Sequence, residues 1–295
     1  MAMRSWYRLV RVGVAVLLGS VLVAFPARSA GAAVSTTAAS SAACRSSSHS
    51  ALAARLARDI QVAQRGRISA VAVRVDDPGK RLGCWLHSAR RFDSASVVKV
   101  TILGALLRKA LDRHRYLTGT EAAWARAMIT SSDNDAASAL WAELGHEYIQ
   151  HFLNLAGMKQ TVLGPGGYWG LTQITAHDEA RLLQLLVSKN PILDLASRNY
   201  ALSLMSQVIP AQRWGVPAGA PRRLTVHLKN GWLPMPAHGW RVHSIGCFTG
   251  RRGGYSIVVL TQNNPSMAYG IHTIEAIARV IHRDLNPVKR VRRHR

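Results

Sequence analysis

The chain has 295 residues, of which 48% are hydrophobic, and its formal net charge is +23. The length and apolar content exclude a disordered or fibrous protein and predict one large core or two smaller lobes. Although the charge would suit nucleic acid, the arginines are scattered and no nucleic-acid-binding motif accompanies them, so we expect no nucleic-acid partner.

The N-terminal segment has the pattern of an export signal. Arg4, Arg8 and Arg11 precede the apolar run VGVAVLLGSVLVAF, and the small residues SAGAA follow it. That run is shorter than the roughly 20 residues that a membrane-spanning helix needs. We predict a secretory signal peptide over 1–32, cleaved near Ala32, and a secreted protein. An uncleaved N-terminal anchor is the alternative.

Export changes how the charge and the cysteines are interpreted. Anionic cell-wall polymers or a membrane surface are the expected counterions, and the densest basic cluster, KRVRRHR, forms a predicted tail over 288–295. A solvated terminus is the alternative for that tail. In an oxidising compartment two of Cys44, Cys84 and Cys247 can pair. We favour Cys44 with Cys84, since both lie outside the helical lobe described below, and the lack of CxxC spacing argues against a metal site.

The predicted elements begin after a segment rich in Ser, Ala and Thr. This segment suits a linker over 33–49, so the folded domain should start near Ser50. A helix is predicted over SALAARLARDIQVAQ, where Leu52, Leu56 and Ile60 share one face. Two strands, ISAVAVRVDD and RLGCWLH, follow and are joined by a Pro-Gly turn.

The middle of the chain is predicted to be helical in five or six segments over about 96–215. Three strands follow, in LTVHLKNGW, WRVHSIGCFTG and YSIVVLTQ, and the apolar stripe of GIHTIEAIARVIHRDL predicts a final helix. The order predicts an α+β fold over 50–287, in which a five-stranded antiparallel sheet is flanked by N- and C-terminal helices and carries an inserted all-helical lobe. A cleft is expected where the two lobes meet.

Three short motifs fall in order along this domain. SVVK places Ser96 and Lys99 one helical turn apart, SDN occupies 132–134 at a helix junction, and KNG occupies 229–231 at the end of a strand. Each motif alone has an ordinary interpretation. A Ser-x-x-Lys pair arises by chance, Ser-Asp-Asn is a good helix N-cap, and Lys-Asn-Gly is a plausible turn.

Together, the ordered set resembles that of class A β-lactamases and penicillin-binding proteins. The resemblance covers about 50–285, including the order of the elements. It implies a serine hydrolase without a cofactor, which forms an acyl-enzyme at Ser96 with β-lactams or D-alanyl peptides. Lys99 would take the hydroxyl proton, because crowding by a second cation and burial lower a lysine pKa. Ser132 would relay a proton to the leaving nitrogen.

The resemblance also implies how a substrate is held. Asn134 would bind the substrate amide, Lys229 would attract its carboxylate, and the backbone N–H groups of Ser96 and Trp232 would face the oxyanion. Asn230 stands where the family usually has Thr, and its amide can still hydrogen-bond a carboxylate.

One arginine and two histidines also lie on or near these strands. Arg241 and His243 alternate on one strand face and could add charge for the carboxylate, or could be solvated strand positions. His227 lies near them by resemblance, but such spread-out histidines without carboxylates make a poor zinc site, so no metal is expected.

The chain departs from the family pattern mainly where deacylation is concerned. The interval from Ser96 to Ser132 is short, which predicts that one wall of the cleft is cut down. Class A enzymes carry a deacylating glutamate on a loop after the SDN helices, but here no Asp or Glu occurs between Glu147 and Asp178. Asp178 and Glu179 fall in a predicted first helical turn, where the dipole favours acids.

The remaining candidates for a substitute base are His177 and Tyr168. We therefore predict acylation with slow deacylation, by a monomer acting on a small β-lactam or peptidoglycan-peptide substrate. One alternative is a non-catalytic module that binds wall peptides or β-lactams. Another is a cationic wall or membrane adhesion protein with a vestigial cleft.

Overall fold

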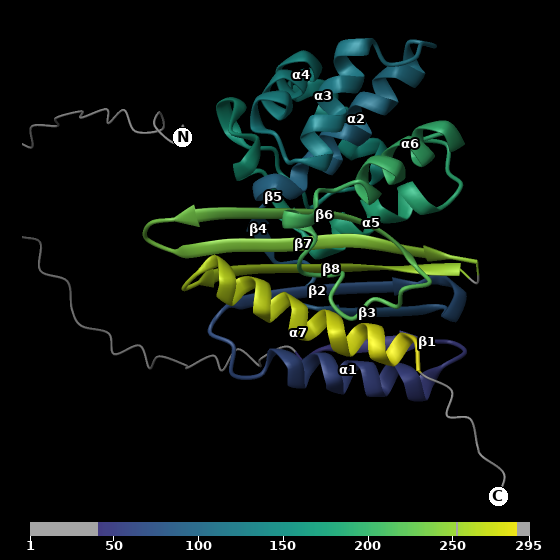
Figure 1. Cartoon of the computed structure of the whole chain (residues 1–295), viewed down its shortest axis with the longest axis vertical. Coiled ribbons are helices and arrows are strands. Elements are labelled where there is room, and N and C mark those ends of the chain that lie inside the picture. The colour runs from purple at the N-terminus through teal and green to yellow at the C-terminus, as the bar shows by residue number, and fades with distance from the viewer. Residues whose placement is uncertain (1–40, 252, 288–295) are drawn as a thin grey trace, which may run out of the picture. The chain divides into compact units, whose positions relative to one another are not determined.

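The computed structural model describes residues 41–251 and 253–287, whose elements follow the predicted order (Figure 1). The strands are β1 (Ala43–Ser46), β2 (Ala70–Asp77), β3 (Leu82–Leu86), β4 (Arg91–Asp93), β5 (Gln173–Thr175), β6 (Thr225–Met235), β7 (Gly239–Gly250) and β8 (Gly253–Asn264). The α-helices are α1 (Ser50–Gln64), α2 (Lys99–Asp112), α3 (Gly119–Thr130), α4 (Asn134–Ala156), α5 (Ala176–Val187), α6 (Leu195–Ser206) and α7 (Met267–Leu285). Short 3₁₀ helices include η1 (Pro78–Lys80), η2 (Ala95–Val98), η3 (Pro165–Gly167), η4 (Trp169–Leu171) and η5 (Pro210–Gln212).

The main sheet has six antiparallel strands in the order β1-β3-β2-β8-β7-β6. The α+β prediction is confirmed, but the expected count of five strands omits β1. This short strand pairs with β3 at the sheet edge, with Cys44 opposite Cys84. Its composition resembles a linker, so only pairing with a neighbour reveals it as a strand. The folded unit consequently starts before Ser50, and the predicted linker overlaps β1.

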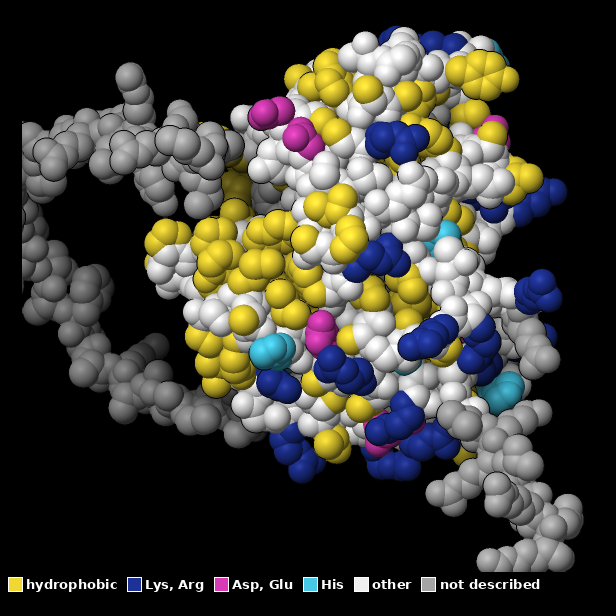
Figure 2. Space-filling view, viewed as in Figure 1, with side chains coloured by type: hydrophobic (Ala, Val, Ile, Leu, Met, Phe, Trp, Pro, Cys, Tyr) yellow, Lys and Arg dark blue, Asp and Glu magenta, His cyan; other side chains and the backbone are white. Residues whose placement is uncertain are grey.

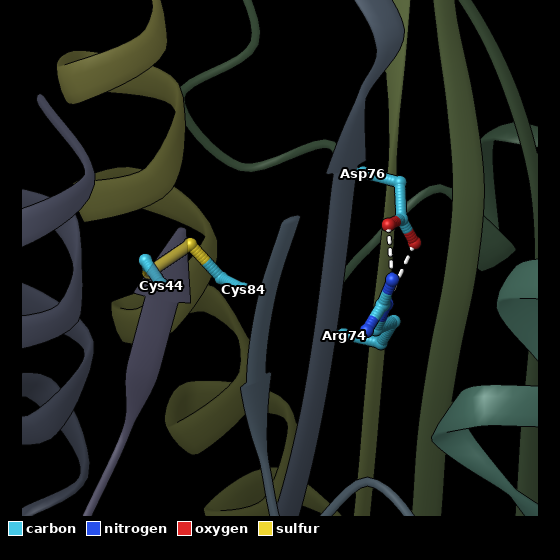
Figure 3. The surroundings of a disulfide bond; sticks show 4 residues. All are labelled: Cys44, Arg74, Asp76 and Cys84. Carbon is cyan, nitrogen blue, oxygen red and sulfur yellow. Dashed lines mark hydrogen bonds and ion pairs between the residues drawn. A yellow bond between two sulfur atoms is a disulfide. The ribbon is translucent and has the colours of Figure 1, made fainter. Parts of the chain in front are cut away.

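A disulfide joins the edge strand to its neighbour. Cys44 and Cys84 are bonded, which confirms the predicted pair (Figure 3). Cys247 is a buried free thiol, and burial raises its pKa to about 12. Because the thiolate is the reactive form, this thiol is held in its unreactive state.

One face of the sheet is covered by the two terminal helices, α1 and α7, which lie side by side against it (Figure 1). Alternation along β2 directs Val73 and Val75 into this layer. Ile60 of α1 and Ile277 of α7 are buried against them. The predicted roles of both terminal helices as cover for the sheet are confirmed.

The other face of the sheet meets α5, beyond which α2, α3, α4 and α6 form the helical lobe (Figure 1). The lack of a side chain at Gly104 lets α2 pack closely on α4. A β-carbon at this position would lie 2.5 Å from the ring of Phe152. Gly145, with φ of 74°, kinks α4 and separates the two segments that the sequence predicts there. The lobe also contains a strand, β5, which pairs with β4 just before the nucleophile motif.

Several predictions lie outside the described residues. These are the signal peptide over 1–32, the first part of the linker and the basic tail over 288–295. Among the residues that the structure describes, no helix has the length and hydropathy to span a membrane.

Candidate active site

The candidate nucleophile sits on a tight turn between β4 and α2. Ser96 lies in η2 and is half-buried, and Lys99 begins α2 directly after it. Ala95, the preceding residue, has φ of 47°, in the left-handed region. Such a conformation costs on the order of 1–3 kcal/mol in a residue other than glycine and is concentrated at functional sites.

Lys99 is fully buried, and three oxygens surround its amine. Nζ donates to the carbonyl oxygen of Ser132 at 2.6 Å, to Asn134 Oδ1 at 2.8 Å and to Ser132 Oγ at 3.3 Å. Burial lowers the pKa of Lys99 to about 7, although the negative charge of Asp133 opposes this shift. A substantial fraction of this lysine is therefore neutral near pH 7 and able to accept a proton.

A second buried amine reaches the same hydroxyl from the sheet. Lys229 of β6 donates from Nζ to Ser132 Oγ at 2.9 Å and to its neighbour's carbonyl, Asn230 O, at 2.8 Å. Burial, and next the positive charge of Lys99, lower the pKa of Lys229 well below its usual value. Ser132, whose φ is 60°, thus links the two amines through its hydroxyl. This chain of groups can carry protons between the lobe and the sheet.

The glycine of the KNG motif lets β6 approach the nucleophile turn. A β-carbon at Gly231 would lie 2.9 Å from the backbone nitrogens of Ser96 and Val97, so any side chain there would displace the turn. Trp232 follows on the same strand, opposite Val242 of β7. The backbones of η2 and β6 therefore lie next to each other, as the predicted oxyanion role of Ser96 and Trp232 requires.

Asn230 does not take the position that the sequence predicts. Lys229 and Gly231 face the nucleophile turn, so alternation directs Asn230 to the opposite side of β6. There it is 1% exposed, and its Nδ2 donates to the carbonyls of Gln212 at 2.7 Å and Trp214 at 2.9 Å. The side chain braces the preceding loop rather than presenting an amide for a carboxylate.

Arg241 and His243 are also placed differently from both predicted alternatives, since each is buried and each holds Asp93. Arg241 Nε lies 2.9 Å from Asp93 Oδ2, and His243 Nε2 lies 2.8 Å from the carbonyl of Asp93. The amide of Thr261 donates to His243 Nδ1, which fixes the proton on Nε2, and burial lowers the pKa of His243 to about 4. These residues fix the strand that precedes Ser94 and the nucleophile, instead of adding a free charge to the cleft.

The loop opposite the amines contributes an aromatic ring. The centroid of the Trp169 ring lies 4.7 Å from Lys99 Nζ, and its Nε1 donates to Ser138 Oγ of α4 at 3.1 Å. Ser94 Oγ donates to the Trp169 carbonyl, which ties the loop to the segment before the nucleophile. A cation–π contact of this kind favours a charged amine, in opposition to burial. Trp169 was not among the predicted site residues, although a large aromatic side chain in an uncharged loop is a signal visible in the sequence.

The acids that follow this loop are buried in α5. Asp178 Oδ2 accepts from the Gln160 amide and from Thr161 Oγ1, both at 2.8 Å. Glu179 is fully buried, neither of its carboxylate oxygens has a hydrogen-bond partner, and burial raises its pKa well above the usual value. Both lie in the first turn of α5, as predicted, and the bonds of Asp178 serve the base of the loop.

The two predicted substitute bases are not gathered at the amines. His177 Nδ1 lies 3.1 Å from Asp178 Oδ1, and its ring lines a groove formed with β2 and the β2–β3 turn. Tyr168 is 55% exposed, and its hydroxyl makes no hydrogen bond to another described residue. His227 is bonded to the Leu202 carbonyl and Thr249 Oγ1, and no group of three or more metal-ligating side chains occurs within the described ranges.

An inserted helical lobe on an antiparallel sheet, with a Ser-x-x-Lys turn, a bridging serine and a strand lysine at their junction, defines a β-lactamase-like serine hydrolase fold. A family model described as "Beta-lactamase enzyme family" matches residues 120–285, more than half of the chain. The chain therefore belongs to this beta-lactamase family, and the resemblance inferred from the motifs is confirmed. No curated protein matches the sequence.

Solved structures show the same fold. A class A beta-lactamase from Bacteroides cellulosilyticus DSM 14838 is 16% identical with a TM-score of 0.69, covering 79% of this chain and 98% of its own. A beta-lactamase from Sphaerobacter thermophilus DSM 20745 is 20% identical with a TM-score of 0.68 and the same coverage. A variant of PBP-A, solved as an acyl-enzyme complex with penicillin G, is 19% identical with a TM-score of 0.66, covering 79% of this chain and 96% of its own.

Proposed function

We propose that the protein is an exported serine hydrolase that β-lactams or D-alanyl peptides acylate at Ser96, and that releases the acyl group slowly. The observation that carries this proposal is the asymmetry of the groups around the candidate site. On one side, Lys99, Ser132 and Lys229 form a continuous chain of hydrogen bonds. On the other side, the loop presents Trp169 and no carboxylate.

Acylation would begin when neutral Lys99 accepts the proton of Ser96 Oγ, which attacks the carbonyl carbon of the lactam or peptide amide. The carbonyl oxygen becomes an oxyanion facing the N–H groups of Ser96 and Trp232. As the carbonyl reforms, the C–N bond breaks and the nitrogen takes a proton from Ser132 Oγ. Ser132 recovers that proton from one of the two amines to which it is bonded.

Substrate binding would use the Lys229 amine and the Asn134 amide. Lys229, in its protonated form, would supply positive charge for the carboxylate that penicillins and D-alanyl peptides carry. Asn134 accepts from Lys99 through Oδ1, which leaves its amide N–H groups to donate to a substrate carbonyl. Asn230 and Arg241 have no place in this proposal, because both side chains are bonded within the protein.

Deacylation requires a base that activates water beside the Ser96 ester. A carboxylate on the loop does this in class A β-lactamases. Here the two nearest acids in sequence, Asp178 and Glu179, are buried in α5, and Trp169 covers Lys99. Slow release is the expected consequence, and it favours a peptidase-like acyl-enzyme over an efficient β-lactamase.

A non-catalytic binding module is the second candidate function. It is favoured by the contacts of Lys99, whose amine is bonded only to Ser132 and Asn134 among the described residues, with no hydrogen bond to Ser96 Oγ. An amine held in this way could serve substrate binding alone. The two candidates differ in a single observable, which is covalent attachment to Ser96.

Intact-mass spectrometry of the protein after mixing with a penicillin tests this difference. We expect a mass increase of one penicillin at Ser96, no increase in Ser96→Ala, and a normal increase in the matched control Ser131→Ala, an exposed serine beside the SDN motif. Labelling that persists in Ser96→Ala would remove this serine from the mechanism. A stable complex without any covalent increase would establish the binding module. The mass of protein recovered from the culture medium tests export, since residues 1–32 should be missing.

A further inference from the structure

A second groove lies away from the candidate active site, between β2, the β2–β3 turn and α5. Its volume is about 470 Å³. β2 and β3 stand at the far end of the sheet order from β6, with β8 and β7 between β2 and the strand that carries Lys229. The side chains that give the groove its chemistry are Arg74, Asp76, Arg81, His177 and Arg181.

The groove lies on the face of β2 and β3 that is turned away from α1 and α7. On this face, α5 covers the strands only in part. Val73 and Val75 of β2 point toward α1 and α7, so Arg74 and Asp76 point to the opposite face. Figure 3 shows this Arg74–Asp76 pair apart from the disulfide that lies on the other side of the strands. Gly83 of β3 adds no side chain there, and the floor of the groove stays low.

The charges in the groove do not balance. Asp76 is bound by Arg74, with Oδ2 2.8 Å from Nε, and Asp77 is bound by Lys80 at 2.6 Å. Arg81 and Arg181 are exposed, and neither has a carboxylate partner among the described residues. Two guanidinium groups from separate segments therefore face the groove with their donors largely unused, as the Ala156 carbonyl is the only acceptor bonded to Arg181 within 41–251 and 253–287.

The basic surface continues from the groove across the neighbouring strands. Trp85 of β3 lies between two guanidinium groups, with Arg74 5.8 Å and Arg45 of β1 5.5 Å from its ring centroid. β1, β3 and β2 are adjacent in the sheet, and α5 packs on β2. The arginines of this surface thus lie on neighbouring segments, which suits an extended ligand with repeated negative charges: Arg45 of β1, Arg81 directly before β3, Arg74 of β2 and Arg181 of α5.

We propose that this groove binds a polymer that carries repeated phosphate groups. Guanidinium groups match phosphate in geometry and bind it through paired hydrogen bonds. Several such contacts along one chain would add, because each phosphate after the first binds intramolecularly. A concave groove admits a chain of this kind, whereas a flat bilayer surface does not reach its floor.

Bulk charge is the explanation that a test must separate from this site. Lys and Arg side chains also gather over α1 and α7, as the lower part of Figure 2 shows. Arg58 of α1 and Arg65, directly after this helix, are exposed, and α1 covers the opposite sheet face. They supply a control with the same loss of charge as a change of Arg81 and Arg181.

The experiment is calorimetric titration of the mature protein with a short inorganic polyphosphate chain. We expect Arg81→Gln/Arg181→Gln to weaken binding about tenfold, because two charge-assisted contacts are lost. The control Arg58→Gln/Arg65→Gln should change affinity by less than about twofold, since distant exposed charges are screened. Penicillin acylation should be unchanged in both, which separates this site from Ser96.

Three results would overturn the proposal. They are no binding of polyphosphate by the unaltered protein, equal weakening in the two double variants, and binding of vesicles of anionic phospholipid that depends on Arg81 and Arg181 while polyphosphate does not bind. The single change Arg81→Gln, at an exposed side chain without a hydrogen bond to the described protein, keeps the test valid if the double variant unfolds.

Discussion

The two sides of the candidate active site differ in whether their buried ionisable groups have hydrogen-bond partners. On the wall formed by α2, α4 and β6, the buried amines of Lys99 and Lys229 are satisfied by hydrogen bonds and meet at Ser132. Behind the other wall, the carboxyl of Glu179 is buried without a partner, and the loop itself offers only the Trp169 ring. Hydrogen-bond partners allow a buried ionisable group to carry a charge, whereas burial without partners shifts its pKa toward the neutral form.

The comparison assigns the two half-reactions to different walls. Under the proposed function, the amine wall carries the groups proposed for acylation, and the loop wall offers no carboxylate for deacylation. Removing the amine, titrating it, adding a carboxylate to the loop and replacing the unpaired Glu179 each test this difference between the walls.

Removal of the amine should have the largest effect. Lys99→Met keeps the apolar stem but removes the group that accepts the Ser96 proton, so we expect the second-order rate of acylation by a penicillin to fall about 10³-fold. Time-resolved mass spectrometry measures this rate. A fall of less than about tenfold would mean that another group, with Lys229 the nearest, acts as the base.

Titration of the amine should have the next largest effect. With a pKa of about 7 for Lys99, protonation below this pH removes the proton acceptor. The acylation rate should therefore rise about tenfold per pH unit below 7 and level off above it, giving about a 100-fold range between pH 5 and the plateau. A rate independent of pH from 5 to 8 would contradict the role of this amine. The same profile in Lys99→Met should be flat.

Supply of the missing acid should give a smaller gain. Trp169→Glu places a carboxylate where the loop faces Lys99, and we expect the penicillin adduct to be lost at least about tenfold faster. The matched variant Trp169→Gln opens the same space without a charge and should leave the lifetime of the adduct nearly unchanged. If both variants release the adduct equally fast, exclusion of water by the indole ring, rather than lack of a base, limits deacylation.

Replacement of the unpaired carboxyl of Glu179 should raise the free energy of unfolding by a modest amount. Burial raises the folded-state pKa of Glu179, so its protonated form favours folding, and this stability is lost as pH rises from the unfolded pKa through the folded one. Glu179→Leu should therefore raise the free energy of unfolding by about 1–3 kcal/mol at pH 8 and by less at pH 4. Urea unfolding at both pH values measures this. Identical gains at the two values would show that packing, not ionisation, causes the change.

Periodic features of the sequence were sufficient to predict most of the fold. The switch from period two to helical spacing marks the sheet and the lobe, and both apolar terminal helices pack where expected. The three motifs also locate the hydrogen-bonded groups of the candidate site. The predicted order of helices and strands brings Lys99, Ser132 and Lys229 together.

The predictions that were wrong share a physical cause. Each depends on a contact with a residue far away in the sequence, which leaves no local sequence pattern. β1 is a strand only because it pairs with β3. Asn230 faces away from the cleft because strand alternation is set by Gly231, which must approach the nucleophile turn. Arg241 was expected to be free, but its partner, Asp93, lies far away in sequence.

The central claim is that acylation is fast and deacylation slow, and a stopped-flow reaction with a chromogenic cephalosporin tests it most directly. We expect a burst of colour equal to one turnover per molecule of enzyme, followed by a much slower steady phase. Rapid steady turnover without a burst would contradict it, because that result requires a base for deacylation that the loop wall does not supply.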